Sequence, residues 1–327
     1  MTTPRRSRRG AADGAPVVPD ATFTSYYGRP VVKESPWEKD IPAYLFLGGL
    51  AAGSSLLAAG ADLTDRPTLR RSGRLGALAG ITLSFAALVH DLGRPSRFVN
   101  MLRVAKPTSP MSVGTWLLTA YGPAAGAAGA AELLPLVPPP LRGVVRALGR
   151  PAGLGAAVIA PAVASYTAVL LSDTATPAWS SAKRELPFVF VGSAAAAAGG
   201  LGMIGARFED AGPARRLAFA GLVGEVLAHR AMEHSMGLSA ETLHDGTAGR
   251  VEDLGKAAAG VGGISALLAE LVGRRHHGVG RVLSAAGGVG LMVGSACTRF
   301  GIFQAGQASA RDPKYTVVPQ RERLDPP

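Results

Sequence analysis

Cysteine is almost absent from this sequence: Cys297 is the only one in 327 residues. A single cysteine cannot form an internal disulfide, and an iron–sulfur cluster is normally held by four protein ligands, mostly cysteine thiolates. We therefore expect no iron–sulfur cluster in this chain, so any such centre must belong to a partner. Cys297 itself is expected to pack as a small apolar side chain.

Charge is also scarce. Asp, Glu, Lys and Arg make up 17% of the chain and apolar residues 47%, whereas soluble domains carry about a quarter charged residues. The charges are clustered. A helix needs about 20 apolar residues to cross a bilayer; four of the stretches between the charges reach that length, 281–299 is slightly shorter, and 74–90 is shorter again, although its flanking Arg can reach the headgroups. Eight stretches are candidate spans. These stretches are 40–62, 74–90, 106–132, 150–173, 185–207, 217–236, 257–272 and 281–299, of which 217–236 and 257–272 are interrupted by Glu225 and Glu270. The sequence predicts an all-α, polytopic transmembrane bundle of about eight spans.

Polar segments flank this bundle. We predict a polar, Arg- and Pro-rich N-terminal tail over 1–40, the bundle over 41–303, and a polar C-terminal tail over 304–327. The opening Met1–Arg9 has two Arg pairs but no apolar stretch directly after them, which disfavours a cleaved signal peptide. The net charge of +11 comes largely from Arg residues beside the spans. Such residues set membrane topology, so we expect no nucleic-acid partner.

Eight spans bring both tails to one face of the membrane. The longer connections 91–111, 173–186 and 237–256 share that face, whereas short Arg-bearing turns at 63–74, 136–150, 207–216 and 273–281 lie on the other. Because Lys and Arg in short loops favour the cytoplasmic side, the face with the termini is predicted to be extracytoplasmic. The Arg cluster at the N-terminus favours the opposite orientation.

Glycine is abundant, with 43 residues. Several glycines are spaced four apart within the spans, as in helices that approach each other closely. The pairs are Gly49/Gly53, Gly76/Gly80, Gly122/Gly126 and Gly290/Gly294. We interpret this spacing as helix packing.

The run from His90 to Phe98 is the most informative motif. His90 and Asp91 end one span, and Gly93 and Pro95 follow directly, so the helix is expected to stop there. Ionisable groups at a membrane bundle's mouth are typical of functional sites, and we predict a proton donor and acceptor pair of catalytic residues, His90 and Asp91. The alternative is a capped helix end at which Arg94 and Arg97 bond Asp91 and lipid phosphates.

Two tyrosines are further candidates. Tyr44 lies one turn inside the first span, where it either hydrogen-bonds a buried carbonyl or acts as an interfacial anchor. Tyr166 lies in the fourth span, and a buried hydroxyl there needs a partner, either another helix or a ligand oxygen.

The sixth span carries Glu225, His229 and Glu233 at four-residue intervals, on one helix face. A carboxylate within the bilayer indicates a proton relay, for which we name Glu225 and His229; the alternative is a buried Glu225–His229 pair. Of the six His, His229 and His234 share a helix and none is opposed on a facing span, so we expect no haem. The sequence also has no P-loop, dinucleotide-binding or zinc-protease motif.

From about residue 37 to 315 the chain resembles the NrfD/PsrC family, the membrane anchor subunits of polysulfide reductase-type molybdoenzymes. The motif across the second and third spans is specific, whereas the Gly- and Ala-rich second half of the chain is not. The matching stretches are 42–53 (PAYLFLGGLAAG), 90–98 (HDLGRPSRF), 108–116 (TSPMSVGTW), 165–171 (SYTAVLL) and 177–179 (PAW).

This resemblance implies a haem-free bundle of eight helices in a prokaryotic plasma membrane. It implies that the bundle docks a four-cluster ferredoxin-like iron–sulfur subunit, which connects it to a molybdopterin subunit holding molybdenum or tungsten. It also implies exchange of electrons with a membrane quinone, menaquinone or ubiquinone, without a complete redox centre in this chain.

By position, the resemblance suggests that Tyr44, Asp91 and Tyr166 line the quinone pocket, with His90 nearby. Some members have His where this chain has Tyr44, and the Asp91 match requires a small shift of the loop. Arg94, Arg97 and Arg103 are expected to dock the acidic surface of the iron–sulfur partner.

Two other functions compete with this hypothesis. An ion-coupled transporter or proton channel would use Glu225 and would need a polar path across the whole bilayer. A purely structural anchor would bind the partner but no quinone. The substrate of the catalytic partner is not encoded in this chain.

Overall fold

The structure is a computed structural model that describes residues 30–273 and 275–324, and these residues are all-helical in their regular elements. Within them, eight helices have 20 residues or more. They are α1 (Asp40–Leu63), α2 (Pro67–Asp91), α4 (Pro110–Ala131), α5 (Arg142–Ser172), α7 (Leu186–Gly205), α8 (Gly212–Ser235), α10 (Gly246–Gly273) and α11 (His277–Arg311). Four shorter helices are α3 (Phe98–Met101), α6 (Pro177–Ser181), α9 (Glu241–His244) and α12 (Lys314–Leu324).

Each long helix contains most or all of one expected span. Six of them, α1, α2, α5, α7, α10 and α11, are long and apolar enough to cross a membrane. The protein is thus a multi-pass membrane protein with six candidate spans. Helix α8 carries charged residues including Arg215, Glu225 and Glu233, and neither α8 nor α4 is among the six. That α4 and α8 also cross the membrane stays a prediction.

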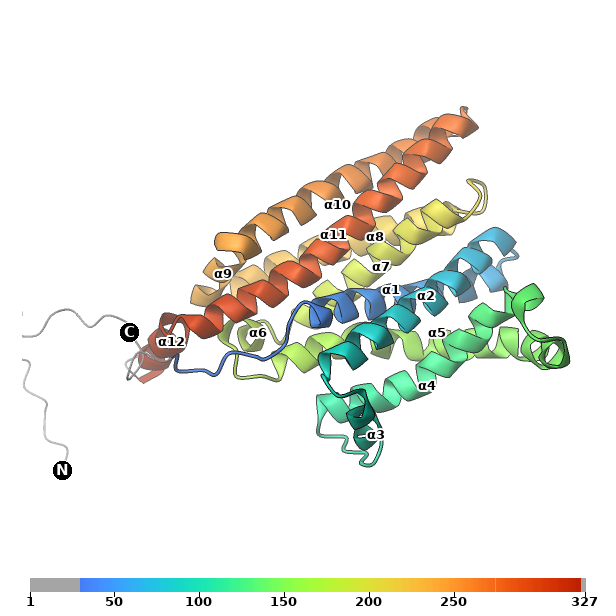
Figure 1. Ribbon diagram of the computed structural model, residues 1–327. Helices are drawn as coiled ribbons and strands as arrows, with labels where there is room; N and C mark the ends of the chain where they lie inside the picture. The colour runs from blue at the N-terminus through green and yellow to red at the C-terminus, as the bar shows by residue number, and fades with distance from the viewer. Residues whose placement is uncertain (1–29, 274, 325–327) are drawn as a thin grey trace, which may run out of the picture.

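The long helices lie side by side and alternate in direction (Figure 1). Consecutive long helices form hairpins, and the most extensive helix contacts are α1 with α2, α4 with α5, α7 with α8 and α10 with α11. The hairpin turns lie at one end of the bundle, here named face B. The start of α1 and helices α3, α6, α9 and α12 lie toward the other end, named face A (Figure 1). The long and short connections therefore separate as the sequence predicts.

Proline sets where many helices begin. Pro67, Pro110, Pro177, Pro187 and Pro213 lie in the first turns of α2, α4, α6, α7 and α8. The first-turn N–H has no partner within a helix, so the missing N–H of proline costs nothing there. At the other end of α2, the helix stops at Asp91 as expected, and Gly93 takes a φ of +64°, which glycine adopts without steric cost.

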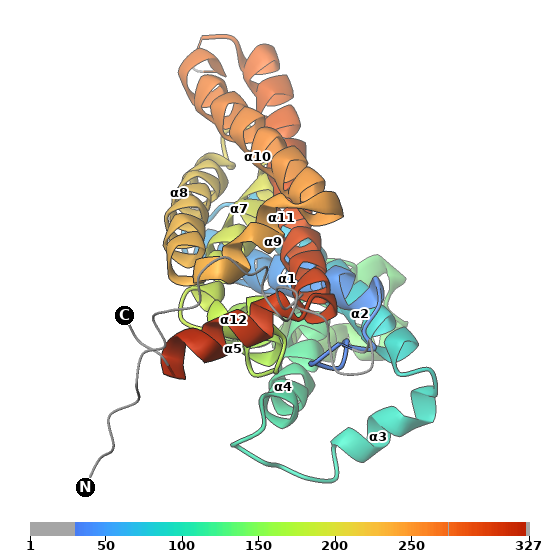
Figure 2. The same ribbon diagram turned by 90° about the vertical axis from the view of Figure 1, so that its left-hand side faces the viewer.

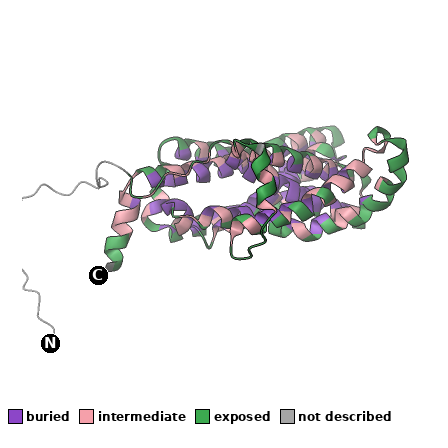
Figure 3. Cartoon of the chain, turned by 60° about the horizontal axis from the view of Figure 1, so that its bottom comes forward, coloured by how far each residue is buried: buried purple, intermediate pink, exposed green. Residues whose placement is uncertain are grey.

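Helices α1 and α7 form the centre of the bundle. Within their apolar windows 78% and 61% of residues are buried, against 22% for α10. Helix α1 contacts α2, α5, α7 and α11, and lies near the middle in the end-on view (Figure 2). Buried residues line the inside of the bundle and exposed ones its outer surface (Figure 3). Side chains on α1 can therefore contact α2 and α5 as well as α7 and α11.

Small residues let the helices approach closely. A Cβ on Gly200 of α7 would lie 2.6 Å from the carbonyl oxygen of Gly288 on α11, closer than real Cβ contacts. Of the eight glycines in the four spaced pairs, seven have a neighbouring atom within 3.3 Å of where a Cβ would lie, whereas Gly126 faces open space. The packing interpretation of these pairs is confirmed except at Gly126.

The two ends of the described chain meet at face A. Helix α11 continues past residue 303, where the bundle was expected to end, to Arg311, and α12 follows. The Gln307 side-chain amide donates to the carbonyls of Ser35 and Trp37 at 3.2 and 3.0 Å, so the segment before α1 packs on α11. The expected N-terminal tail over 1–40 lies mostly outside the described residues.

Candidate functional site

Two buried tyrosines meet near face A. Tyr44 is in the second turn of α1 and Tyr166 is near the end of α5, and their hydroxyls are hydrogen-bonded to each other. The side chains are 3% and 7% exposed. The Ser84 hydroxyl donates to the backbone carbonyl of Tyr44 at 3.2 Å, which ties α2 to this part of α1. Tyr44 is therefore buried and hydrogen-bonded, but its hydroxyl contacts the Tyr166 hydroxyl rather than the buried carbonyl that the sequence predicts.

A glycine makes room for this pair. A Cβ on Gly114 of α4 would lie 2.4 Å from the ring of Tyr166, so only glycine lets α4 approach the ring here. The sequence motif Ser112-Val113-Gly114-Thr115 therefore has a packing reason at its glycine.

A cavity of about 110 Å³ lies beside the two tyrosines. Its polar lining residues include Tyr44, Tyr166, Asp91 and Thr115, and apolar side chains form the rest of the wall. The apolar wall is made by Trp37, Ile41, Leu88, Leu92, Phe98, Met101, Met111, Leu118 and Leu170. A few polar groups in a mostly apolar wall are typical of small-molecule binding sites.

The two residues of the His-Asp pair separate. Asp91 is half-buried, lines the cavity, and bonds to the backbone of Glu38. His90 does not line this cavity: its side chain is 79% exposed, and its Nδ1 lies 2.7 Å from Oδ2 of Asp40 at the start of α1. The structure thus brings Tyr44, Asp91 and Tyr166 together and leaves His90 on the surface of face A.

A larger groove reaches the same site from the outside of the bundle. It has a volume of about 700 Å³, runs between α4 and α5, and includes Tyr166 in its wall. Val113, Leu117, Ala162 and Val169 make it apolar, and Asp173, Lys183 and Arg184 lie at its face A end. Tyr166 therefore borders both the inner cavity and the open groove.

The three arginines expected to dock a partner lie on the connection between α2 and α4. Arg94, Arg97 and Arg103 are all exposed, and the short helix α3 projects from the bundle there (Figure 1). Asp91 is hydrogen-bonded to Glu38 backbone rather than to Arg94 or Arg97 in the described contacts. The alternative of an arginine-capped Asp91 is therefore not the observed arrangement.

A second polar cluster lies in the other half of the bundle. Glu225 of α8 accepts a hydrogen bond from the Thr298 hydroxyl of α11 at 2.7 Å, so it is not paired with His229. His229 instead has its Nε2 3.3 Å from Oε1 of Glu233 and 3.8 Å from Oε2 of Glu252. These residues line a cavity of about 450 Å³.

Two buried charged residues in this region, Glu252 and Arg299, are not among the candidates predicted from the sequence. Glu252 was expected in a loop, but α10 begins at Gly246 and buries it to 3% exposure. Arg299 was expected to end the last span, but it lies inside α11 and is 1% exposed. Its Nη2 donates to the Phe190 carbonyl at 2.7 Å, and its guanidinium lies 3.8 Å from the centre of the Phe190 ring. The signal that could have indicated this burial is that the helix continues beyond Arg299 to Arg311.

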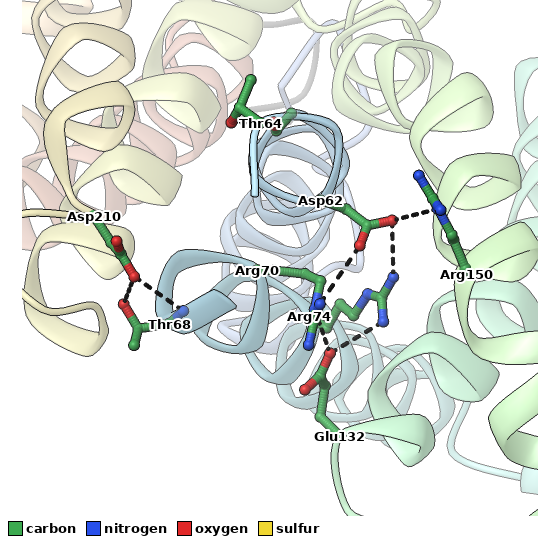
Figure 4. Close-up of polar contacts among 9 residues, drawn as sticks. Asp62, Thr64, Thr68, Arg70, Arg74, Glu132, Arg150 and Asp210 are labelled. Carbon is green, nitrogen blue, oxygen red and sulfur yellow. Dashed lines mark hydrogen bonds and ion pairs between the residues drawn. The ribbon is translucent and has the colours of Figure 1, made fainter. Parts of the chain in front are cut away.

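A third cluster joins four helices near face B (Figure 4). Asp62 of α1 lies 3.6 Å from Arg70, 3.5 Å from Arg74 and 3.2 Å from Arg150, and Glu132 lies 2.9 Å from Arg70 and 3.0 Å from Arg74. We name these five residues the face B charge cluster. The side chains of Asp62, Arg74 and Glu132 are about nine-tenths buried. The sequence indicated its arginines only as topology signals in the turns.

Asp210, in the turn between α7 and α8, caps α2 (Figure 4). Its carboxylate accepts from the Thr68 backbone N–H at 3.2 Å and from the Thr68 hydroxyl. The Thr68 hydroxyl and the nearby Arg207 and Arg66 lower the pKa of Asp210 below its ordinary value. A carboxylate at a helix N-terminus satisfies N–H groups that have no partner inside the helix.

Metal ligation finds no support in the part of the chain that the structure describes, where no three His, Cys, Asp or Glu side chains are grouped to hold an ion.

The family comparison agrees with the sequence motifs. The model of the family described as "Polysulphide reductase, NrfD" matches residues 31–227, more than half of the chain. The match includes Tyr44, Asp91, Tyr166 and Glu225 and stops before α10 and α11. No curated protein matches the chain.

Proposed function

Because the chain belongs to the NrfD family of polysulphide reductase membrane subunits, we propose that it exchanges electrons and protons with membrane quinone at the cavity of Tyr44, Asp91 and Tyr166. It is a membrane subunit of a polysulfide reductase-type complex. We propose that this quinone is menaquinone or ubiquinone.

The buried contact between the Tyr44 and Tyr166 hydroxyls is the observation that carries it. Two donors aimed at each other beside Asp91, inside an apolar wall, match the polar oxygens and apolar body of a quinone. Tyrosine hydroxyls in such surroundings need a partner, and a ligand carbonyl oxygen can replace one hydroxyl as partner of the other.

The volumes of the inner cavity and of the groove support a ligand that occupies both. The inner cavity of about 110 Å³ is smaller than typical small-molecule pockets of roughly 300–1,000 Å³. The adjoining groove of about 700 Å³ is apolar and open along the bundle surface. The polar ring then occupies the inner cavity and the isoprenoid tail the groove, with Tyr166 at the boundary between them.

Each residue then has a stated part in the chemistry. The hydroxyls of Tyr44 and Tyr166 donate to carbonyl oxygens and hold the ring, while the apolar wall excludes water. Asp91 transfers protons at the ring, as a positioned general acid and base. His90, paired with Asp40 at the surface, exchanges protons between Asp91 and the water at face A. A bound quinone supplies the electron-accepting and electron-donating chemistry.

Electrons come from a partner in this proposal, because the single cysteine of the chain cannot hold an iron–sulfur cluster. The family implies a four-cluster ferredoxin-like subunit and a molybdopterin subunit that holds molybdenum or tungsten. We propose that Arg94, Arg97 and Arg103 bind the iron–sulfur subunit, since these cations are exposed and exposed cations steer an acidic surface. This docking puts the electron donor beside the end of α2 and the cavity.

The transporter alternative needs a polar path through the whole bundle. In the described residues, the polar cluster around Glu225 is followed toward face B by buried Ala218, Ala266 and Leu291. These apolar neighbours favour the anchor function over transport.

The test is Asp91→Asn in the assembled complex. We expect quinone turnover to fall by about a hundredfold, the scale of one general acid or base, while the iron–sulfur and molybdopterin subunits still co-purify. Asp253→Asn is the matched control, because Asp253 is exposed on α10 and lies outside the cavity. Normal turnover in Asp91→Asn would refute the role of Asp91 and return the structural-anchor function to first place.

A further inference from the structure

The cavity between α8, α10 and α11 belongs to no part of the proposed quinone site. It has a volume of about 450 Å³ and is lined by ionisable groups from two helices and by Thr298 from the third. A cavity of this size has room for several waters, because one water needs only about 10–15 Å³ of such volume. Water and ionisable groups together are the components of a proton path.

Two buried side chains place polar atoms in this cavity that water can hydrogen-bond. Glu252 is 3% exposed and His229 is 7% exposed. Oε1 of Glu252 has no hydrogen-bond partner among the described residues, and Nε2 of His229, although 3.3 Å from Oε1 of Glu233, makes no well-aligned hydrogen bond there. Both side chains line the cavity. A buried polar atom without a partner is destabilising, and a water molecule in the cavity removes that cost by hydrogen-bonding to it.

The polar groups form a series from the surface inward. At face A, Glu233 lies 3.5 Å from both Lys256 and His244, whose side chains are about half exposed. Next come His229 and Glu252. Arg230 lines the same cavity.

The series ends in the middle of the bundle. Glu225 is bonded to Thr298, and the guanidinium of Arg299 lies near it and supplies the compensating positive charge. Toward face B, one heptad further along α8 and α11, Ala218 and Leu291 are buried in an apolar cluster. The polar path therefore opens at face A and is closed toward face B.

We propose that this cavity is a proton half-channel, which connects water at face A to Glu225 through Glu233, His229 and Glu252. In each step a proton leaves a hydronium ion, an imidazolium or a carboxylic acid and converts the next carboxylate or imidazole into its protonated form. No electron moves. The half-channel does not depend on quinone binding.

Its inner end also lies close to α1. A Cβ on Gly49 would be 3.3 Å from Nη2 of Arg299, and Gly49 is about one and a half turns from Tyr44 along α1, at 3.6 residues per turn. A change in the charge of Glu225 therefore changes the electrostatic potential beside α1, the helix that carries Tyr44.

Infrared spectroscopy of the full-length chain in quinone-free lipid nanodiscs tests the proposal. A pH titration is expected to show the carbonyl band of protonated carboxylic acids, with intensity lost in Glu225→Gln and in Glu252→Gln. Asp253→Asn, one residue from Glu252 but exposed on α10, is expected to keep the full band. Transfer to heavy water should shift the band, because the half-channel admits solvent.

His229→Asn tests the relay rather than the carboxyl groups. We expect the hydrogen–deuterium exchange of the band to slow by about a hundredfold, the lower end of the range lost with one acid–base group, with the band intensity kept. An unchanged exchange rate would overturn the relay through His229.

Labelling of the wild-type chain with dicyclohexylcarbodiimide, which modifies protonated carboxyl groups in apolar surroundings, avoids any question of misfolded variants. Mass spectrometry is expected to find the label on Glu225 or Glu252, and not on Asp253. Absence of label on both glutamates, or a carbonyl band unchanged in both Gln variants, would overturn the half-channel. These results leave the quinone proposal untouched, since no quinone is present.

Discussion

Individual hydroxyls and carboxylates carry the proposed chemistry, and sequence predicts their positions to different degrees. The motifs single out Tyr44, Asp91 and Tyr166, and these three lie around one cavity. His90 is adjacent to Asp91 in sequence but points to Asp40, because successive residues on a helix diverge by about 100°. Adjacency in sequence is thus a poor guide to shared surroundings.

Tyr166 borders both the inner cavity, the proposed site of the quinone ring, and the outer groove, the proposed site of its tail. We expect Tyr166→Phe to lower quinone turnover by about tenfold to a hundredfold, because one hydrogen-bond donor to a developing charge is lost. Steady-state oxidation or reduction of a quinone analogue by the complex measures this.

Tyr121→Phe is the control for that substitution. Tyr121 is as buried as Tyr166 and its hydroxyl is 2.8 Å from that of Ser55, but it does not line the cavity. Equal loss of turnover in both variants would assign the effect to packing rather than to the cavity.

The lengths of the helices explain why the burial of Glu252 and Arg299 could not be predicted from the sequence. Charge usually marks the end of a span, so the sequence places Glu252 in a loop and Arg299 at a span boundary. Helices α10 and α11 instead run through both positions, and the Phe190 carbonyl and ring accommodate the Arg299 guanidinium. A buried charge with a local partner cannot be told from a boundary charge by spacing alone.

The contact of α7 with α11 depends on Gly200. We expect Gly200→Ala to destabilise the bundle by about 1–3 kcal/mol, the usual cost of overpacking, since the new methyl group would overlap the Gly288 carbonyl. Thermal unfolding in detergent measures it. Gly126→Ala, which meets open space, should be neutral or stabilising by up to about 1 kcal/mol; equal destabilisation by both would contradict the packing argument.

The cap of α2 by Asp210 predicts a pH effect. Asp210→Ala is expected to cost about 1 kcal/mol of stability, as for other helix caps, and Glu209→Ala, its exposed neighbour, should cost little. Because the pKa of Asp210 is lowered in the folded protein, the stabilisation is present above the ordinary Asp value and is lost as pH falls through the lowered one. Unfolding followed from pH 7 to below about pH 4, the ordinary Asp range, should show the two variants converge; persistence of the difference in acid would refute the cap.

For the molecule as a whole, the alternation of apolar and charged stretches predicted the helix order and the sorting of long and short connections. It did not predict that α1 and α7 would be central and α10 peripheral. Burial on several sides is a property of the assembled bundle, and α1 and α10 are both apolar enough to span.

Partner binding is the prediction at this scale. Arg94→Glu combined with Arg97→Glu should reduce recovery of an iron–sulfur subunit with the tagged chain by about tenfold or more, because like charges placed at an interface cost several kcal/mol. Arg146→Glu with Arg216→Glu, exposed near face B, should leave recovery unchanged. Mass spectrometry and metal analysis of the purified material give the readout, and equal recovery in both double variants would remove the docking surface.

The face B charge cluster also has a consequence for how the chain enters the membrane. Its members emerge from the ribosome in the order Asp62, Arg70, Arg74, Glu132 and Arg150. The first hairpin, α1 with α2, pairs Asp62 with Arg70 and Arg74, and Glu132, directly after α4, supplies the second negative charge for these two arginines. The cluster is therefore complete only after α5 has been synthesised and Arg150 has reached Asp62.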